Sequence, residues 1–184
     1  MKEILITGGA GYIGTSLIPE LLEKNYNVTV YDSLTYAGDI LIPFFKYPNF
    51  NFIKGDILEN QKLKSALKGK DVIIHLAALG YAACEKNHNM TQLVNCDATD
   101  NLVKMLTPEQ LLLFGSTGSN YGKVTNGICT EETPLNPTSL YAETKTYAEQ
   151  KAMSHDNTIA YRFATAFGSS PRLRLDLLIN ELTY

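Results

Sequence analysis

The sequence predicts an α/β fold, a doubly wound parallel Rossmann sheet formed by one domain, residues 1–184. Short β-rich apolar runs alternate with longer segments of helical periodicity, and this alternation implies right-handed βαβ crossovers. A glycine-rich turn lies between the first strand and the first helix, as in dinucleotide-binding domains. With 184 residues, the chain is long enough for one sizeable core.

Six strands and the helices between them account for most of the chain. The apolar runs EILIT, NVTVYD, FNFIKGD, DVIIHLAA, LLLFGS and IAYRF predict strands at 3–7, 27–32, 50–56, 71–78, 111–116 and 159–163. The helical periodicity predicts helices from the glycine-rich turn to residue 24, near 59–68, up to residue 106 and at 139–154. Six strands in this alternation predict the sheet order 3-2-1-4-5-6.

Composition and charge exclude several classes of protein. Hydrophobic residues make up 45% of the chain and charged residues 19%, which is ordinary for globular proteins and unlike disordered or fibrous ones. The net charge is -3 and basic residues form no run, so we expect neither nucleic acid nor a membrane as a partner. Cys84, Cys96 and Cys129 lack the spacing of a disulfide framework or a metal site. No segment has the length of a signal peptide or membrane span, and we expect a cytoplasmic protein without bound metal.

The turn ITGGAGYIG, residues 6–14, has the glycine pattern of a dinucleotide-binding site. Gly8, Gly11 and Gly14 fit the spacing GxxGxxG, and Gly9 completes GxGxxG. Glycines allow the tight turn and the close approach of a pyrophosphate, and the N-terminus of the following helix offers N–H groups to the anion. The alternative is a glycine-rich turn without a ligand, but the strand before and the helix after it favour dinucleotide binding.

Two aspartates follow the second and third strands. Asp32 comes about 20 residues after the last glycine of the turn, where a carboxylate binds the adenosine ribose. Its charge would repel a 2′-phosphate, so the sequence predicts NAD rather than NADP as the cofactor. Asp56 either binds the adenine amine or caps the end of the third strand, and the sequence leaves both open.

A Tyr-x-x-x-Lys pair places both side chains on one face of a helix. The ammonium can then favour the phenolate and lower the tyrosine pKa, which gives a base for the oxidation of an alcohol. The pattern occurs as Tyr141/Lys145 and as Tyr147/Lys151, about 120° apart around one helix, so both cannot face one site. Because Tyr141 lies near the helix start predicted by NPTS, we expect the first pair at the carboxyl edge of the sheet, where ligands bind.

Hydroxyl groups follow the fifth strand at the same edge of the sheet. Thr117 lies in GSTGSNYG, and its hydroxyl could share the proton of a substrate alcohol. The alternative is a Ser/Thr-rich turn that satisfies its own backbone.

Six motifs taken in order resemble the extended short-chain dehydrogenase/reductases, and among them the NAD-dependent nucleotide-sugar epimerase/dehydratase family. They are TGGAGYIG, Asp32 within YDSLTYAG, GDI, HLAA, GSTGSNYG and YAETK. The resemblance covers essentially the whole chain, since YRFATAFG and SPRLRLDLLIN also match the sixth strand and the substrate-side helix of this family.

The resemblance implies roles for individual residues. Thr117, Tyr141 and Lys145 would be catalytic, with Tyr141 as the base and Lys145 also holding the nicotinamide ribose. Cofactor contacts are implied, in addition, for the residues of the turn and the strand ends: Gly8, Gly11, Tyr12, Ile13 and Gly14 at the pyrophosphate, Asp32 at the ribose, Asp56 and Ile57 at the adenine, and Leu76, Ala77 and Ala78 along the groove. His75 is expected to be a packed structural histidine.

The implied activity is epimerisation of a nucleotide-diphosphate sugar through a transient keto-sugar, with NAD taking and returning the hydride. Family dehydratases carry an Asp-Glu pair after the catalytic Thr, whereas Gly118 and Ser119 follow Thr117 here, which favours epimerisation or simple keto-reduction. Arg172 and Arg174 would either reach a phosphate or lie on the surface.

The resemblance also bears on assembly. The family's C-terminal substrate domain is largely absent, residues 165–184 being its start, so we expect exposed apolar surface. A homodimer is expected through the helices at 91–106 and 139–154. The alternative to an enzyme is a truncated, non-catalytic NAD-binding or oligomerisation module.

Overall fold

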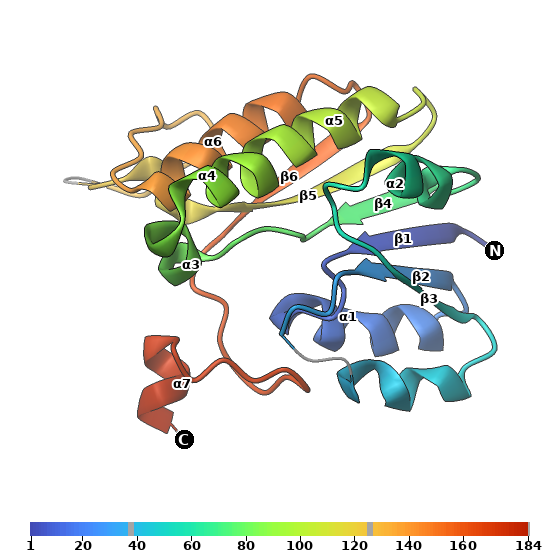
Figure 1. Cartoon of the computed structure of the whole chain (residues 1–184). Helices are drawn as coiled ribbons and strands as arrows, with labels where there is room; N and C mark the ends of the chain where they lie inside the picture. Colours follow the sequence, from blue (N-terminus) through green and yellow to red (C-terminus); the bar gives the residue numbers. More distant parts are fainter. Residues whose placement is uncertain (37–38, 125–126, 184) are drawn as a thin grey trace.

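The computed structural model describes residues 1–36, 39–124 and 127–183. Its strands form one sheet of six, in the order β3-β2-β1-β4-β5-β6, and every neighbouring pair is parallel (Figure 1). The strands are β1 (Glu3–Thr7), β2 (Asn27–Asp32), β3 (Phe50–Lys54), β4 (Val72–His75), β5 (Leu111–Thr117) and β6 (Thr158–Phe163). The predicted α/β fold and the predicted strand order are confirmed.

Helices cover both faces of the sheet. They are α1 (Tyr12–Glu23), the 3-10 helix η1 (Asp39–Lys46), α2 (Asn60–Leu67), α3 (Tyr81–Lys86), α4 (His88–Thr91), the π-helical segment η2 (Gln92–Asp97), α5 (Ala98–Met105), the 3-10 turn η3 (Gly118–Tyr121), α6 (Leu140–Ala152) and α7 (Leu178–Thr183). The helix predicted to end at residue 106 is thus several segments, and η1 was not predicted. Within the described residues, no helix is long and apolar enough to cross a membrane.

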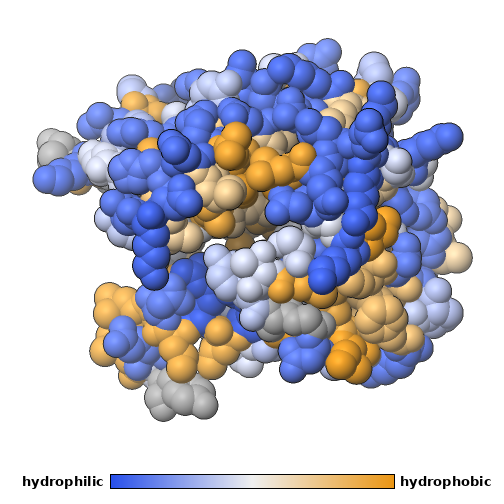
Figure 2. Space-filling model, in the orientation of Figure 1, coloured by the Kyte–Doolittle hydropathy of each residue, from blue (hydrophilic) through white to orange (hydrophobic). Residues whose placement is uncertain are grey.

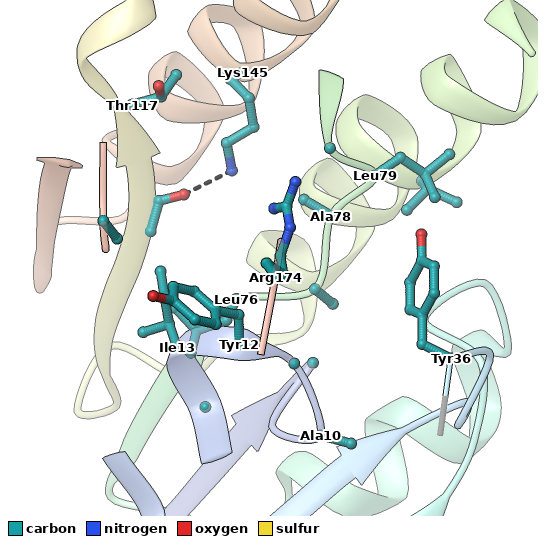
Figure 3. Close-up of a pocket in the computed structure, with 18 of the residues that line it drawn as sticks. Ala10, Tyr12, Ile13, Tyr36, Leu76, Ala78, Leu79, Thr117, Lys145 and Arg174 are labelled. Carbon is teal, nitrogen blue, oxygen red and sulfur yellow. Dashed lines mark hydrogen bonds between the residues drawn. The ribbon is translucent and has the colours of Figure 1, made fainter. Parts of the chain in front are cut away.

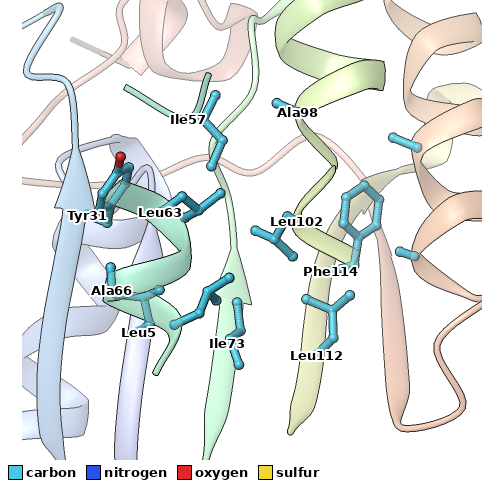
Figure 4. Close-up of a cluster of buried hydrophobic side chains, with 13 residues drawn as sticks. Leu5, Tyr31, Ile57, Leu63, Ala66, Ile73, Ala98, Leu102, Leu112 and Phe114 are labelled. Carbon is cyan, nitrogen blue, oxygen red and sulfur yellow. The ribbon is translucent and has the colours of Figure 1, made fainter. Parts of the chain in front are cut away.

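Two apolar cores hold the layers together, one on each face of the sheet. Leu5, Ile73 and Phe114 point from the strands toward α2, α5 and α6, as Figure 4 shows. Their neighbours in the strands, such as Ile6 and Ile74, point the opposite way and pack beneath α1 and η1. Because successive side chains alternate between faces, a central strand covered on both sides needs an unbroken apolar run.

The parallel register brings all the strand ends to one edge of the sheet. Thr7, at the end of β1, pairs with Tyr31 of β2 and with His75 of β4. On the other side, Thr117 at the end of β5 pairs with Phe163 at the end of β6. The loops that follow these strands therefore lie side by side, and ligand sites of doubly wound sheets form at this edge.

The sixth strand is an edge strand with one uncovered apolar face. Ala160 packs toward α6, whereas Ile159, Tyr161 and Phe163 point to the opposite face and are 40–47% exposed. The rings of Tyr161 and Phe163 stack with their centres 5.8 Å apart. Apolar side chains are therefore exposed on this strand.

Candidate active site

A cleft of about 1100 Å³ runs along the carboxyl edge of the sheet. The space-filling view shows it as a hollow between the layer of α3 to α6, at the top, and the layer of α1, below (Figure 2). Its walls are the loops that follow the strands, together with the start of α6 and the segment after β6. Every residue predicted from the sequence to bind the cofactor or to act in catalysis lines this cleft: Gly8, Gly11, Tyr12, Ile13, Gly14, Asp32, Asp56, Ile57, Leu76, Ala77, Ala78, Thr117, Tyr141 and Lys145. The individual roles of these residues remain predictions.

The glycine-rich turn is packed too closely for side chains. Gly8 has φ +70°, and a Cβ at this position would lie 2.6 Å from the backbone nitrogen of Ala77. A Cβ at Gly14 would lie 2.4 Å from the carbonyl oxygen of Gly9. Gly11 is the N-cap of α1 and supplies no capping side chain, so the helix start is open to an anion in the cleft.

Asp32 is held beside this turn by two backbone hydrogen bonds. Its Oδ2 accepts from the backbone N–H of Ala10 at 3.0 Å, and its Oδ1 accepts from that of Leu34 at 2.8 Å. These bonds fix the carboxylate at the end of β2, and each oxygen keeps a lone pair for a further donor in the cleft.

Asp56 acts as a cap in this structure. Its Oδ1 accepts a hydrogen bond from the backbone N–H of Leu58 at 2.9 Å, and its own N–H donates to Glu59 at 2.8 Å. The capping interpretation of the sequence is confirmed. The adenine contact remains a prediction, since Asp56 also lines the cleft.

Tyr141 and Lys145 lie on the face of α6 that borders the cleft. Ser139 caps the helix by accepting from the backbone N–H of Ala142, which places Tyr141 in the first turn. The Lys145 Nζ donates to the carbonyl oxygen of Gly115 at 2.6 Å, the dashed line in Figure 3. It also lies 4.2 Å from the ring centre of Phe114.

The second Tyr-Lys pair lies elsewhere on α6. Tyr147 is 38% exposed, and the Lys151 ammonium stands 5.3 Å from the centre of its ring. Neither residue lines the cleft. The prediction that the first pair lies at the carboxyl edge of the sheet is therefore confirmed, while its catalytic role stays a prediction.

Burial governs the ionisation of the two α6 residues. It lowers the pKa of Lys145 to about 8, against the opposing influence of the Glu149 carboxylate. It also raises the pKa of Tyr141, and a hydrogen bond with the Thr117 side chain only partly opposes this. The prediction that Lys145 lowers the tyrosine pKa is wrong here, because loss of solvent dominates and the ammonium is directed to Gly115 and Phe114.

Thr117 closes its own turn, as one interpretation of its motif predicts, while its role in sharing a substrate proton stays a prediction. Its Oγ1 accepts from the backbone N–H of Ser119 at 3.1 Å, which closes the turn after β5. The same side chain forms the hydrogen bond with Tyr141 described above. The turn therefore also holds a hydroxyl next to the tyrosine.

His75 is a packed residue, as predicted. Its Nδ1 lies 2.6 Å from the Thr7 hydroxyl and its Nε2 lies 3.1 Å from the Thr99 hydroxyl. Burial, with a smaller contribution from the Lys145 charge, lowers its pKa to about 3, so the ring is neutral at pH 7.

Sequence reasoning missed Asn95, which connects the groove to α6. Its Oδ1 accepts from the backbone N–H of Leu79 at 2.8 Å, and its Nδ2 donates to the Thr144 hydroxyl at 3.3 Å. Asn95 lies in the π-helical segment η2, and such segments are frequent at functional sites. The only signal in the sequence was a polar residue within the helix predicted to end at residue 106.

The segment after β6 folds back over the start of α1. The Tyr12 hydroxyl donates to the Gly168 carbonyl at 2.7 Å, and Ser170 donates to the Tyr12 carbonyl at 2.8 Å. This places Arg172 and Arg174 in the cleft wall, and Figure 3 shows Arg174 pointing inward past Ala78. Both arginines thus face the cleft, while contact with a phosphate remains a prediction.

The fold and the site together define a class of protein. A doubly wound sheet carries an open helix start in a glycine turn, an acid at the end of β2, and Thr117, Tyr141 and Lys145 in a single cleft. This is the arrangement of a Rossmann-fold short-chain dehydrogenase/reductase.

Comparison with known proteins identifies the family. The family model "NAD dependent epimerase/dehydratase family" matches residues 4–173, and the chain belongs to this family. It is 33% identical to the uncharacterized UDP-glucose epimerase YtcB of Bacillus subtilis, over 98% of this chain and 61% of that protein.

Solved structures agree. The chain superposes on dTDP-glucose 4,6-dehydratase from Bacillus anthracis in complex with NAD with a TM-score of 0.86 and 28% identity, covering 99% of this chain and 60% of that one. UDP-glucuronic acid 4-epimerase from Bacillus cereus, solved with UDP-glucuronic acid and NAD, gives a TM-score of 0.86 and 28% identity over 98% and 61% of the two chains. The chain spans 38–61% of the length of the curated relatives that it matches. The activity of those whole proteins is therefore only proposed for this chain.

Proposed function

We propose that this protein is an NAD-dependent epimerase that acts on a nucleotide-diphosphate sugar through a transient keto-sugar. One observation carries the proposal: a single cleft contains both the glycine-rich turn and the hydroxyl and ammonium groups of Thr117, Tyr141 and Lys145. The structurally similar UDP-glucuronic acid 4-epimerase from Bacillus cereus was solved with UDP-glucuronic acid and NAD, which supports the substrate class.

The residues of the cleft fit NAD. A Cβ would fill the space at Gly8 and Gly14, so the backbone is shaped for the close approach of a pyrophosphate to the start of α1. The Asp32 carboxylate would accept hydrogen bonds from the adenosine ribose hydroxyls, and the Lys145 ammonium would hold the nicotinamide ribose. When bound, NAD supplies the acceptor and donor of a hydride.

The side chains of the chain itself move and hold the proton. The Tyr141 Oη takes the proton of a sugar hydroxyl as that carbon is oxidised, and returns a proton to the keto oxygen when the sugar is reduced from its other face. The first step needs the phenolate of Tyr141, and the phenol formed in that step donates the proton in the second. Burial raises the pKa of Tyr141 in the chain without cofactor and so favours the phenol. The Thr117 hydroxyl shares the same proton, and the Lys145 ammonium holds the ribose.

Epimerisation is favoured over dehydration by the placement of the acids. In the described part of the chain, Asp32 and Asp56 are the carboxylates that line the cleft, and both belong to the β2–β3 half of the sheet. Gly118 and Ser119 form the turn beside Thr117 instead of an acidic pair. Elimination of water needs an acid near the sugar, and the β5 half offers none among these residues.

The first test is cofactor choice. We expect saturable binding of NAD in a calorimetric titration, and weaker binding of NADP, because Asp32 would repel a 2′-phosphate. Asp32→Asn should weaken NAD binding about 10- to 100-fold, since a hydrogen bond to a charged group contributes about 1.5–3 kcal/mol, and should narrow the difference between the two cofactors.

Asp156→Asn, an exposed site on the surface, is the matched control and should bind NAD like the wild type. Failure of the wild-type chain to bind either dinucleotide would contradict the proposed function for these residues.

We also propose a homodimer formed through α4, η2, α5 and α6. Met90, Leu93 and Tyr147 expose 38–42% of their surface on these helices. Sedimentation should show a dimer that Leu93→Glu dissociates, whereas Tyr161→Ser, on the uncovered face of β6, should leave it intact. A monomer at high concentration, or dissociation only by the β6 variant, would refute this interface.

We place the protein in the cytoplasm. All three cysteines are free thiols, and Cys84 and Cys96 are buried apart from any disulfide partner. Free thiols are typical of reducing compartments.

A further inference from the structure

A buried ion pair lies directly behind the catalytic face of α6. Glu149 follows Lys145 by one turn of the helix, and its side chain is 7% exposed. Arg162 of β6 binds it through two nitrogens: Nη2 donates to Oε1 at 2.6 Å, and Nε lies 3.0 Å from the same oxygen. The pair therefore joins α6 to the end of β6.

The second carboxylate oxygen of Glu149 reaches the end of β5. Its Oε2 accepts hydrogen bonds from the Ser116 hydroxyl and, at 3.1 Å, from the Asn120 side chain. Ser116 immediately precedes Thr117, and Asn120 lies in the turn that follows it. One buried carboxylate thus ties together the strand that carries Thr117 and the helix that carries Tyr141 and Lys145.

Glu149 is also the acid that acts on the Lys145 ammonium. The other titratable groups near that ammonium are His75 of β4, Cys84 of α3, Cys96 of η2 and, on α6 itself, Tyr141. Burial lowers the pKa of His75 to about 3 and raises that of Cys96 to about 11, and it raises the pKa of Cys84 and Tyr141 as well. All four groups are therefore uncharged at pH 7.

Glu149, by contrast, is ionised. Burial alone would raise its pKa, but hydrogen bonds from Arg162 and Ser116, with the charge of the guanidinium, lower it below its usual value.

We propose that Glu149 is a positioning residue of the site: it holds Thr117 in register with the α6 face and places its negative charge one helical turn from Lys145. This inference rests on the proposed function, in which the Lys145 ammonium holds the cofactor ribose. Without the carboxylate, burial would act on Lys145 unopposed, and the lysine would lose its proton at lower pH.

The test is the pH dependence of NAD binding. Affinity of the wild type should fall as the pH rises through the Lys145 pKa of about 8. In Glu149→Gln, the midpoint of this fall should move to lower pH by about one unit, since a neighbouring opposite charge shifts a pKa by about that much or more. Glu149→Asp should restore the midpoint in part, and Glu143→Gln, an exposed acid on the same helix, should not move it.

Two further measurements keep the test decisive. Glu149→Gln leaves the partly buried Arg162 without its carboxylate partner, so the double variant Glu149→Gln/Arg162→Leu, which removes both charges, serves if the single variant does not fold. A Lys145 NMR titration without cofactor, with Lys145→Arg to assign the signal, reports the same pKa directly.

The outcomes separate the two proposals. If the wild type binds no NAD, the proposed function fails, and the NMR titration still tests Glu149. An unchanged Lys145 midpoint in the NMR titration of both charge variants, with only a lower melting temperature, would overturn the inference and leave Glu149 a purely structural residue.

Discussion

Replacing Tyr141 by phenylalanine is expected to lower turnover of a nucleotide-diphosphate sugar by about 10²- to 10⁴-fold, the usual contribution of a positioned acid or base. Phenylalanine keeps the ring that fills the space at the start of α6, and it loses only the oxygen that carries the proton. NAD affinity should stay nearly unchanged, because the glycine turn and Asp32 are untouched. The measurement is hydride transfer to bound NAD, followed by the near-ultraviolet absorbance of NADH.

Tyr147→Phe is a close control for this experiment. Tyr147 lies on the same helix and is also followed by a lysine four residues later, but it lies outside the cleft. Its replacement should leave turnover at the wild-type level. Retained turnover in Tyr141→Phe would exclude this residue as the base. A wild-type chain that binds NAD but transfers hydride from no nucleotide sugar would favour the alternative of a non-catalytic NAD-binding module.

The fold and the location of the site were predictable because they depend on short stretches of sequence. Apolar runs such as ILI and VII fix which segments become central strands, and parallel order then places every strand end at one edge. The places of the glycine-rich turn after β1 and of Asp32 after β2 could be predicted from their spacing along the chain. For the same reason, position along α6 was enough to choose Tyr141/Lys145 over Tyr147/Lys151.

The parts that could not be predicted depend on contacts between residues far apart in sequence. Asn95 binds the loop at Leu79, and Glu149 of α6 binds Ser116 of β5. Neither contact leaves a periodic or local pattern. The predicted lowering of the Tyr141 pKa was wrong for the same reason: the Tyr-x-x-x-Lys spacing places the two residues on one helix face, but burial dominates both pKa values.

The second prediction concerns Gly14→Ala in the glycine-rich turn. Helix propensity alone predicts that this change stabilises the protein, whereas packing predicts that it destabilises it. In the interior of a helix, Gly→Ala ordinarily stabilises by about 1 kcal/mol. At Gly14, however, the added Cβ would lie 2.4 Å from the carbonyl oxygen and 2.6 Å from the Cα of Gly9, which are backbone atoms that cannot rotate away. Packing wins, so Gly14→Ala should destabilise the protein by about 1–3 kcal/mol, as overpacked sites do.

The same clash acts on the cofactor. To relieve it, the turn must move away from α1, and the backbone at the helix start then no longer matches a pyrophosphate. NAD affinity in a calorimetric titration should therefore fall more than about tenfold, a loss of about 1.4 kcal/mol or more. Ser16→Ala, an exposed position two residues further along α1, should change neither the melting temperature nor NAD affinity. If Gly14→Ala bound NAD like the wild type, close contact between the turn and the helix would not be what shapes the dinucleotide site.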